Sequence, residues 1–371
     1  RTYLLRAKGT IFKFITMQVF LVAVWSIVVH QIWKEVCQKP ELDPDDCPVA
    51  FKTEAHSMMG GALGFLLVYR ATTAYGRYVT AQEQTGAITM GLRNALMTYI
   101  LLVVQKYKNQ AERGGLRATL GMKSVAEFRR LCILLFAIIR QAARESREGY
   151  EWDPTVSEFE VLSQDLQGVP RLSTVATSQE LAQLSMATPA ERPHLVIAQM
   201  LKFAADNVGT VADSRGGDEI NEAFFAIQYA RLADGLESAQ KGASTLLRLA
   251  ITSTPFSFNH MLHLLVFIMV FTSPFIFVED FQWIIFIPCS LIALTFYGIA
   301  VIGETLDNPL NYISPNVDLT AAGANLYVEL TKMNRVAMPK YYRKRYDDRI
   351  HLEHDKFKYL LIRDVRHTDD K

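Results

Sequence analysis

Hydrophobic residues are unevenly distributed along this chain and form four apolar stretches. These stretches cover residues 11–33, 58–69, 262–278 and 283–302. All but the second approach or exceed the roughly 20 residues that a membrane-spanning helix needs. The second is short, but a helix that faces water or protein at membrane depth tolerates polar residues. The pattern predicts four spans, with residues 57–78 as one helix that continues outside the membrane; an alternative counts residues 88–104 as a fifth span.

The second apolar stretch changes character along its length. It begins as a glycine-rich apolar helix and becomes basic and hydroxyl-bearing within about four turns. Gly61, Phe65 and Tyr69 are spaced by four residues and therefore share one helix face. Arg70 and Arg77 interrupt the apolar run. Such a helix is typical of a wall beside an aqueous path, which favours an anion channel.

Charge placement predicts the topology of the spans. Residues 34–56, between the first two spans, carry six acidic residues against three lysines. Basic residues flank the first span on its N-terminal side and recur at 343–345. By the positive-inside rule, both termini and the large middle region lie on one side of the membrane. The net charge of +1 gives no overall basic field of the kind that nucleic-acid-binding proteins carry.

The remaining sequence predicts helices and no strands. Apolar residues recur at spacings of three and four between 105 and 255, with a clear stretch from 218 to about 253 and another from 319 to 338. Residues 149–193 are rich in Ser, Thr, Gln and Pro and predict a partly ordered excursion. We predict an all-α chain that forms one unit over residues 1–371. Its membrane part covers about 11–80 and 260–303, and its soluble part about 81–259 and 304–371.

Three segments carry a resemblance to a known family. They are LGFLLVYRATTAYGRY at 63–78, GLESAQKGASTLLRLAITSTPFSFNHMLHLL at 235–265 and YGIAVIGETLDNPLNYISPNVDL at 297–319. Their pattern and order resemble the bestrophin family of anion channels. The resemblance implies a homopentamer around one central pore, conducting chloride by default, with nitrate or bicarbonate as alternatives.

The resemblance also implies a pore lining. The family's narrow neck corresponds here to Gly61, Phe65 and Tyr69, where Gly61 replaces a bulkier residue. Aromatic ring edges carry partial positive charge and can face a partly dehydrated anion. The other proposed selectivity positions are Arg70, Thr72 and Thr73. In the alternative interpretation, the two aromatic residues pack against neighbouring helices.

Several charged residues have structural interpretations beside functional ones. Arg70 either attracts anions or forms an ion pair. Arg77 is expected to pair, with Glu83, Glu237 or Glu304 as candidate partners. Only Asp307 and Asp318 remain of the acidic residues in the family's calcium clasp, so we expect a structural turn and no calcium or other cofactor.

The cysteines and histidines leave further alternatives open. Cys37 and Cys47 either form a disulfide in the acidic hairpin or remain free thiols, whereas Cys132 and Cys289 are expected to be packed. The pairs His260/His263 and His351/His354 have a spacing that suits a metal, but neither pair has a convincing third ligand. No Walker A motif, dinucleotide-binding motif or catalytic triad occurs, so we expect no enzyme.

A membrane scaffold and a transporter are the alternatives to a channel. A membrane scaffold would keep the fold and use residues 149–193 to bind partners. A transporter is disfavoured because the hydropathy shows no inverted repeat. The tail at 341–371 is expected to wrap around a neighbouring subunit rather than bind the membrane surface. The missing clasp acids favour a thylakoid location.

Overall fold

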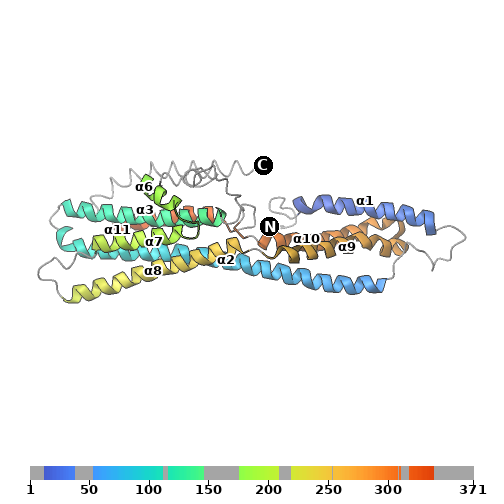
Figure 1. Cartoon of the computed structure of the whole chain (residues 1–371), viewed down its shortest axis with the longest axis horizontal. Helices are drawn as coiled ribbons and strands as arrows, with labels where there is room; N and C mark the ends of the chain where they lie inside the picture. The colour runs from blue at the N-terminus through green and yellow to red at the C-terminus, as the bar shows by residue number, and fades with distance from the viewer. Residues whose placement is uncertain are drawn as a thin grey trace. The chain divides into compact units, whose positions relative to one another are not determined.

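The described part of the chain folds into helices (Figure 1). The computed structural model describes residues 12–37, 53–111, 116–145, 175–208, 219–252, 254–307, 309–310 and 317–337, and within these ranges no strand occurs. The prediction of an all-α chain is confirmed. The elements are α1 (Phe12–Cys37), α2 (Thr53–Ala111), α3 (Leu116–Glu145), α6 (Ser178–Ser185), α7 (Arg192–Val208), α8 (Glu219–Ile251), α9 (Phe256–Phe281), η4 (Gln282–Ile284), α10 (Phe286–Asp307) and α11 (Leu319–Ala337).

The helices belong to two compact units. The first, here called the span unit, comprises residues 1–80 and 252–317, and the second, here called the α3 unit, comprises residues 81–251 and 318–371. Helix α2 contributes its N-terminal part to the span unit and its C-terminal part to the α3 unit.

Four helices of the described chain are long and apolar enough to cross a membrane, as the sequence predicts. The candidate spans are Phe14–Cys37, His56–Lys106, Phe256–Ile284 and Phe286–Asp307. The second covers 51 residues, a length of about 75 Å at 1.5 Å per residue, whereas a hydrocarbon core is about 30 Å thick. Residues 88–104 lie within this single helix and do not form a separate fifth helix.

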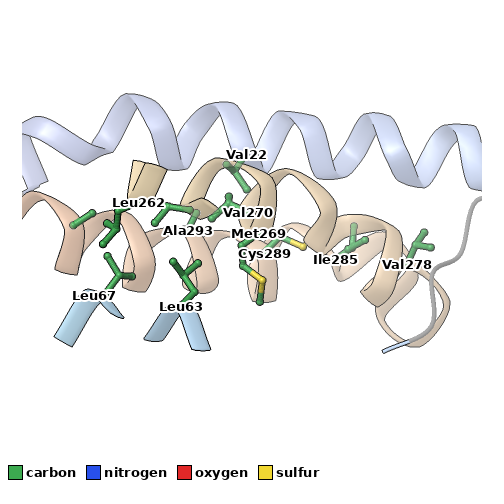
Figure 2. Packing of buried hydrophobic residues seen from close by; sticks show 12 residues of the cluster. Val22, Leu63, Leu67, Leu262, Met269, Val270, Val278, Ile285, Cys289 and Ala293 are labelled. Atoms are coloured by element: carbon green, nitrogen blue, oxygen red, sulfur yellow. The ribbon is translucent and has the colours of Figure 1, made fainter. Parts of the chain in front are cut away.

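The core of the span unit lies between α2, α9 and α10, with α1 packed on α9 and α10 (Figure 2). Leu63 and Leu67 of α2 are buried against apolar residues of α9 that include Leu262 and Met269. A Cβ atom at Gly60 would lie 2.7 Å from Met269 Cε. The absence of a side chain at Gly60 therefore allows α2 and α9 to approach closely.

A proline interrupts the hydrogen bonding of α9. Pro274 has no N–H, so the carbonyl of Val270 lacks its usual helical donor. The hydroxyl of Ser273 donates to that carbonyl at 2.8 Å. From α1, Trp25 Nε1 donates to the carbonyl of Phe271 at 3.1 Å, and its ring stacks on the Phe271 ring with centroids 4.7 Å apart. Trp25 thus braces the proline site in α9.

The Trp25→Phe variant tests this brace, because phenylalanine keeps an aromatic ring but has no N–H donor. We expect the free energy of unfolding of the solubilised protein to fall by about 1 kcal/mol, the usual net value of one hydrogen bond. Chemical denaturation in detergent would measure the change. Trp283→Phe is the matched control because Trp283 is 69% exposed; equal losses in both variants would contradict the brace.

The α3 unit is built around α3. Phe128 of α3 is fully buried and stacks on Tyr99 of α2 with ring centroids 4.3 Å apart. The Tyr99 hydroxyl lies 2.9 Å from Ser124 Oγ. Helices α7, α8 and α11 pack on other faces of α3. A Cβ atom at Gly91 would lie 2.6 Å from the carbonyl oxygen of Gly235, so α2 and α8 cross at backbone contact.

The predicted excursion at 149–193 is more regular than expected where the structure describes it. It contains α6, which begins with a capping box between Thr177 and Glu180, and the start of α7. The sequence Thr-Ser-Gln-Glu at 177–180 is the signal for such a box. Residues 149–174 of the excursion lie outside the described residues, as does the tail at 341–371. The predicted stretches at 218–253 and 319–338 correspond to α8 and α11.

Glu180 also anchors α6 to α3. Its carboxylate accepts hydrogen bonds from Arg130 of α3 at 2.7 and 2.9 Å and from Gln199 of α7 at 2.7 Å. Burial by itself would raise the pKa of Glu180, but the bonds from Arg130, the Thr177 backbone and Gln199 outweigh burial and lower this pKa to about 2. Arg130 also contacts Glu127, so one guanidinium joins two carboxylates.

Candidate functional site

The part of α2 in the span unit has one buried face and one open face. Leu63, Leu67 and Ala74 lie on the buried face. On the open face, Phe65 is 72% exposed and Tyr69 is 59% exposed. The packing interpretation for these two aromatic residues therefore finds no support within their own chain.

The other predicted pore residues of the open face are Gly61, Thr72 and Thr73, all of which are exposed. A Cβ atom at Gly61 would contact nothing, so this position is wide open within the chain. The hydroxyls of Thr72 and Thr73 donate to the carbonyls of Val68 and Tyr69 at 2.9 and 3.0 Å. In this rotamer the hydroxyl hydrogens point back to the helix, so donation to an anion would require the side chains to rotate.

Arg70 departs from the predicted pore lining. The residue is only 3% exposed and lies on the buried side of α2. Its Nη1 lies 3.5 Å from Nε2 of His263 on α9, and a Cβ atom at Gly303 of α10 would lie 3.4 Å from its Cδ. Within its own chain, Arg70 does not share the exposed surface of Phe65 and Tyr69, because successive helical residues point about 100° apart and α9 and α10 cover this one. Its role in anion selectivity stays a prediction.

Arg77 forms the expected ion pair, but with a different partner. Its Nε lies 3.2 Å from Oδ1 of Asp307 and also donates to the Asp307 carbonyl at 3.1 Å. Its Nη2 donates to the carbonyl of Thr252. The Thr254 hydroxyl donates to the second carboxylate oxygen of Asp307 at 2.5 Å. These contacts tie the C-terminal end of α10 and the segment before α9 to α2.

Two of the three candidate partners proposed for Arg77 have other neighbours, and the third, Glu83, is exposed. Glu237 forms an exposed pair with Lys241 one turn further along α8, at 2.5 Å. Glu304 Oε2 lies 4.0 Å from His263 Nε2. Local sequence does not identify Asp307 as the partner, because 230 residues separate it from Arg77.

The remaining candidates have structural positions. Asp318 Oδ1 accepts a hydrogen bond from the backbone N–H of Ala321 at 2.9 Å and so caps α11. The turn residues 311–316 lie outside the described residues. His260 stacks on Phe256 with ring centroids 5.6 Å apart. No group of three or more His, Cys, Asp or Glu side chains in the described ranges is arranged to hold a metal.

The cysteines divide as the sequence suggests. Cys132 and Cys289 are free and buried, which confirms that they are packed. Burial raises the pKa of the Cys132 thiol. Cys37 takes part in a disulfide bond. Cys47 lies outside the described residues, as do His351 and His354.

Comparison with known proteins points to one family. Residues 1–331 match the family model described as "Bacterial/Fungal Bestrophin protein". The voltage-dependent anion channel-forming protein YneE of Escherichia coli K12 is 23% identical over 287 residues, which cover 77% of this chain and 78% of that protein. The protein of the same name from Salmonella typhi is 24% identical over 288 residues, with the same coverage of each chain.

Solved structures show the same fold. A bacterial bestrophin homologue from Klebsiella pneumoniae aligns with a TM-score of 0.56 at 18% identity, over 86% of this chain and 98% of that chain. A variant of a Klebsiella pneumoniae homologue aligns with a TM-score of 0.58 at 16% identity, with the same coverage. The resemblance in the three sequence segments, the match to the family model and the all-helical fold agree: this chain belongs to the bacterial/fungal bestrophin family.

Proposed function

We propose that this protein is an anion channel whose pore is lined by the open face of α2. The observation that carries the proposal is the division of α2 into two faces. Its buried face packs on α9 and α10, while Phe65 and Tyr69 remain exposed on a helix that is long and apolar enough to span a membrane. The names of the E. coli and Salmonella relatives support the same function.

One exposed helix face cannot enclose a pore. A ring of identical subunits, each contributing α2, would close one, and we propose the homopentamer that the family resemblance implies. Phe65 and Tyr69 would then form a neck that holds a partly dehydrated anion against aromatic edges. Chloride is the proposed permeant ion, with nitrate and bicarbonate as alternatives. The mass of the detergent-solubilised particle tests the pentamer; a monomer or dimer would contradict it.

The proposed host membrane follows from the relatives. The similar proteins named above come from bacteria. They give no support to the thylakoid location expected from the sequence, and we propose a bacterial membrane instead. An integral membrane protein is consistent with the four apolar helices.

Current across a planar bilayer tests the pore lining. We expect purified protein in asymmetric chloride to give a reversal potential near the chloride equilibrium value. We expect the Phe65→Ala and Tyr69→Ala double variant to change the conductance or the permeability ratio of chloride to larger anions, because both neck rings are lost. The matched control is Phe20→Ala with Phe267→Ala, two aromatic residues of α1 and α9 that are 62% and 53% exposed.

Each outcome separates the candidate functions. An anion current that the control leaves unchanged and the neck variant alters supports the channel and its lining. A current that neither variant alters keeps the channel and contradicts the lining. A silent bilayer, with protein shown to be folded and inserted, contradicts the channel and favours the membrane scaffold.

A further inference from the structure

A cluster of charged and titratable side chains lies behind the proposed pore face. It joins Arg70 of α2, His263 of α9 and Glu304 of α10. The nitrogen Nε2 of His263 is 3.5 Å from Nη1 of Arg70 and 4.0 Å from Oε2 of Glu304. One imidazole nitrogen thus faces a cation on one side and a carboxylate on the other.

The three members differ in exposure. Arg70 is 3% exposed, and its Nε is buried without a hydrogen-bond partner. The Glu304 side chain is 64% exposed. Within the described residues, the charges that act on His263 come from Arg70, Glu304 and His260, and those that act on Arg70 come from Glu304 and Asp307. The buried cation and the exposed carboxylate therefore both lie beside Nε2 of His263.

The protonation state of His263 decides which of its two neighbours it can bind. A guanidinium N–H can only donate, so Nε2 must be unprotonated to accept from Arg70. A protonated imidazole has no acceptor, repels Arg70 at this distance and attracts Glu304. Histidine is the side chain whose ordinary titration falls between pH 5 and 8.

We propose that His263 is a proton-controlled switch that sets the charge beside the anion path. At neutral and higher pH it accepts from Arg70, and in this cluster the Glu304 carboxylate then faces only the charge of Arg70. On protonation it turns to Glu304, neutralises this carboxylate and releases Arg70 from the contact. The only bond formed is the N–H bond between Nε2 of His263 and one proton taken from solution.

This proposal rests on the proposed function, because the change in charge of the cluster acts on an anion at the open face of α2. Arg70 lies within one turn of Tyr69, Thr72 and Thr73 of that face. A helix is about 10 Å across, which is close to the Debye length at physiological ionic strength. A gain of one positive charge at this distance, in a site partly shielded from water, raises the local concentration of anions.

The test is the chloride current at fixed voltage, recorded at pH 8 and pH 5.5 on the side where α2 leaves the span unit. We expect the current to rise on acidification by a factor on the order of three. The His263→Gln variant, which keeps a polar side chain but cannot titrate, should lose this rise. The matched control is His260→Gln, one turn away on α9, which should keep it.

A second variant covers the case in which His263→Gln does not fold. Glu304 is largely exposed, so Glu304→Gln should preserve the fold. It removes the negative charge that protonated His263 would neutralise, and should therefore raise the current at pH 8 toward the wild-type level at pH 5.5.

The outcomes distinguish this proposal from the channel itself. A current that is equal at both pH values, or whose rise survives His263→Gln, overturns the switch and leaves the channel intact. The switch is also overturned if the current stops rising on acidification in the His260→Gln control and not in the His263→Gln variant. A bilayer without current at either pH refutes the proposed function, and the switch with it.

Discussion

Replacement of Asp307 by alanine is expected to lower the free energy of unfolding of the solubilised protein by about 3–5 kcal/mol. The Asp307 side chain is 7% exposed and the Arg77 side chain 16% exposed, so both charges are largely removed from water. In the variant, Arg77 would keep the two carbonyl acceptors and lose the carboxylate of Asp307. The cost of removing one partner from a largely buried ion pair is larger than the cost of one lost hydrogen bond.

Two further variants define the origin of this loss. The side chain of Asp307→Asn can still accept a hydrogen bond from the Thr254 hydroxyl, so this variant should lose less stability than Asp307→Ala. Asp280→Ala removes an exposed carboxylate from the end of α9 and should change stability little. Chemical denaturation in detergent measures all three. Equal effects of Asp307→Ala and Asp280→Ala would show that the Arg77–Asp307 pair does not stabilise the span unit.

Glu180→Gln is expected to lower the free energy of unfolding by about 2 kcal/mol at neutral pH. The carboxylate joins α6, α3 and α7, and the substitution leaves Arg130 with one charged partner, Glu127, which is partly exposed. The guanidinium of Arg130 stays charged in the variant, because arginine does not lose its proton at neutral pH. Thermal and chemical unfolding measure the loss.

The pH dependence gives an independent check. The pKa of Glu180 is lowered to about 2 from its ordinary value of 4.5. The native state therefore binds fewer protons than the unfolded state between these values. The stabilising contribution is complete above about pH 4.5 and is lost as the pH falls toward 2.

The variants separate this contribution from other acidic groups. Between pH 4.5 and 2, the free energy of unfolding of the wild-type protein should fall, and that of Glu180→Gln should fall by less. Glu237→Gln, which breaks only the exposed pair with Lys241, should behave as the wild type. A Glu180→Gln profile parallel to the wild-type profile would contradict the assignment.

Local sequence features were sufficient to predict the helices. Each span is a run of apolar residues of sufficient length, and hydrophobicity and length are properties of a short segment. The four-residue spacing of Gly61, Phe65 and Tyr69 likewise fixes a shared face in any helix. The capping box at Thr177 was also present in the sequence, but the polar composition around it favoured an irregular segment.

Contacts between residues far apart in the sequence could not be predicted from local features. Arg70 follows Tyr69 directly in the sequence, yet it lies on the covered side of α2 because α9 and α10 pack there. The pairing of Arg77 with Asp307 spans 230 residues, and the contact of Arg70 with His263 spans 193. The spacing of His260 and His263 suits a metal but offers no third ligand, and in the structure His260 stacks on Phe256 whereas His263 lies beside Arg70.

The sequence by itself determined that this chain has four apolar helices, no strands and an aromatic face on α2, because periodicity and composition act within one segment. Only the tertiary structure decided which charges meet. A helix with charges on several sides can turn any of them toward a neighbour, and the choice depends on the combined packing of α2, α9 and α10. That packing buries Arg70 beside His263, pairs Arg77 with Asp307 and leaves Phe65 and Tyr69 exposed.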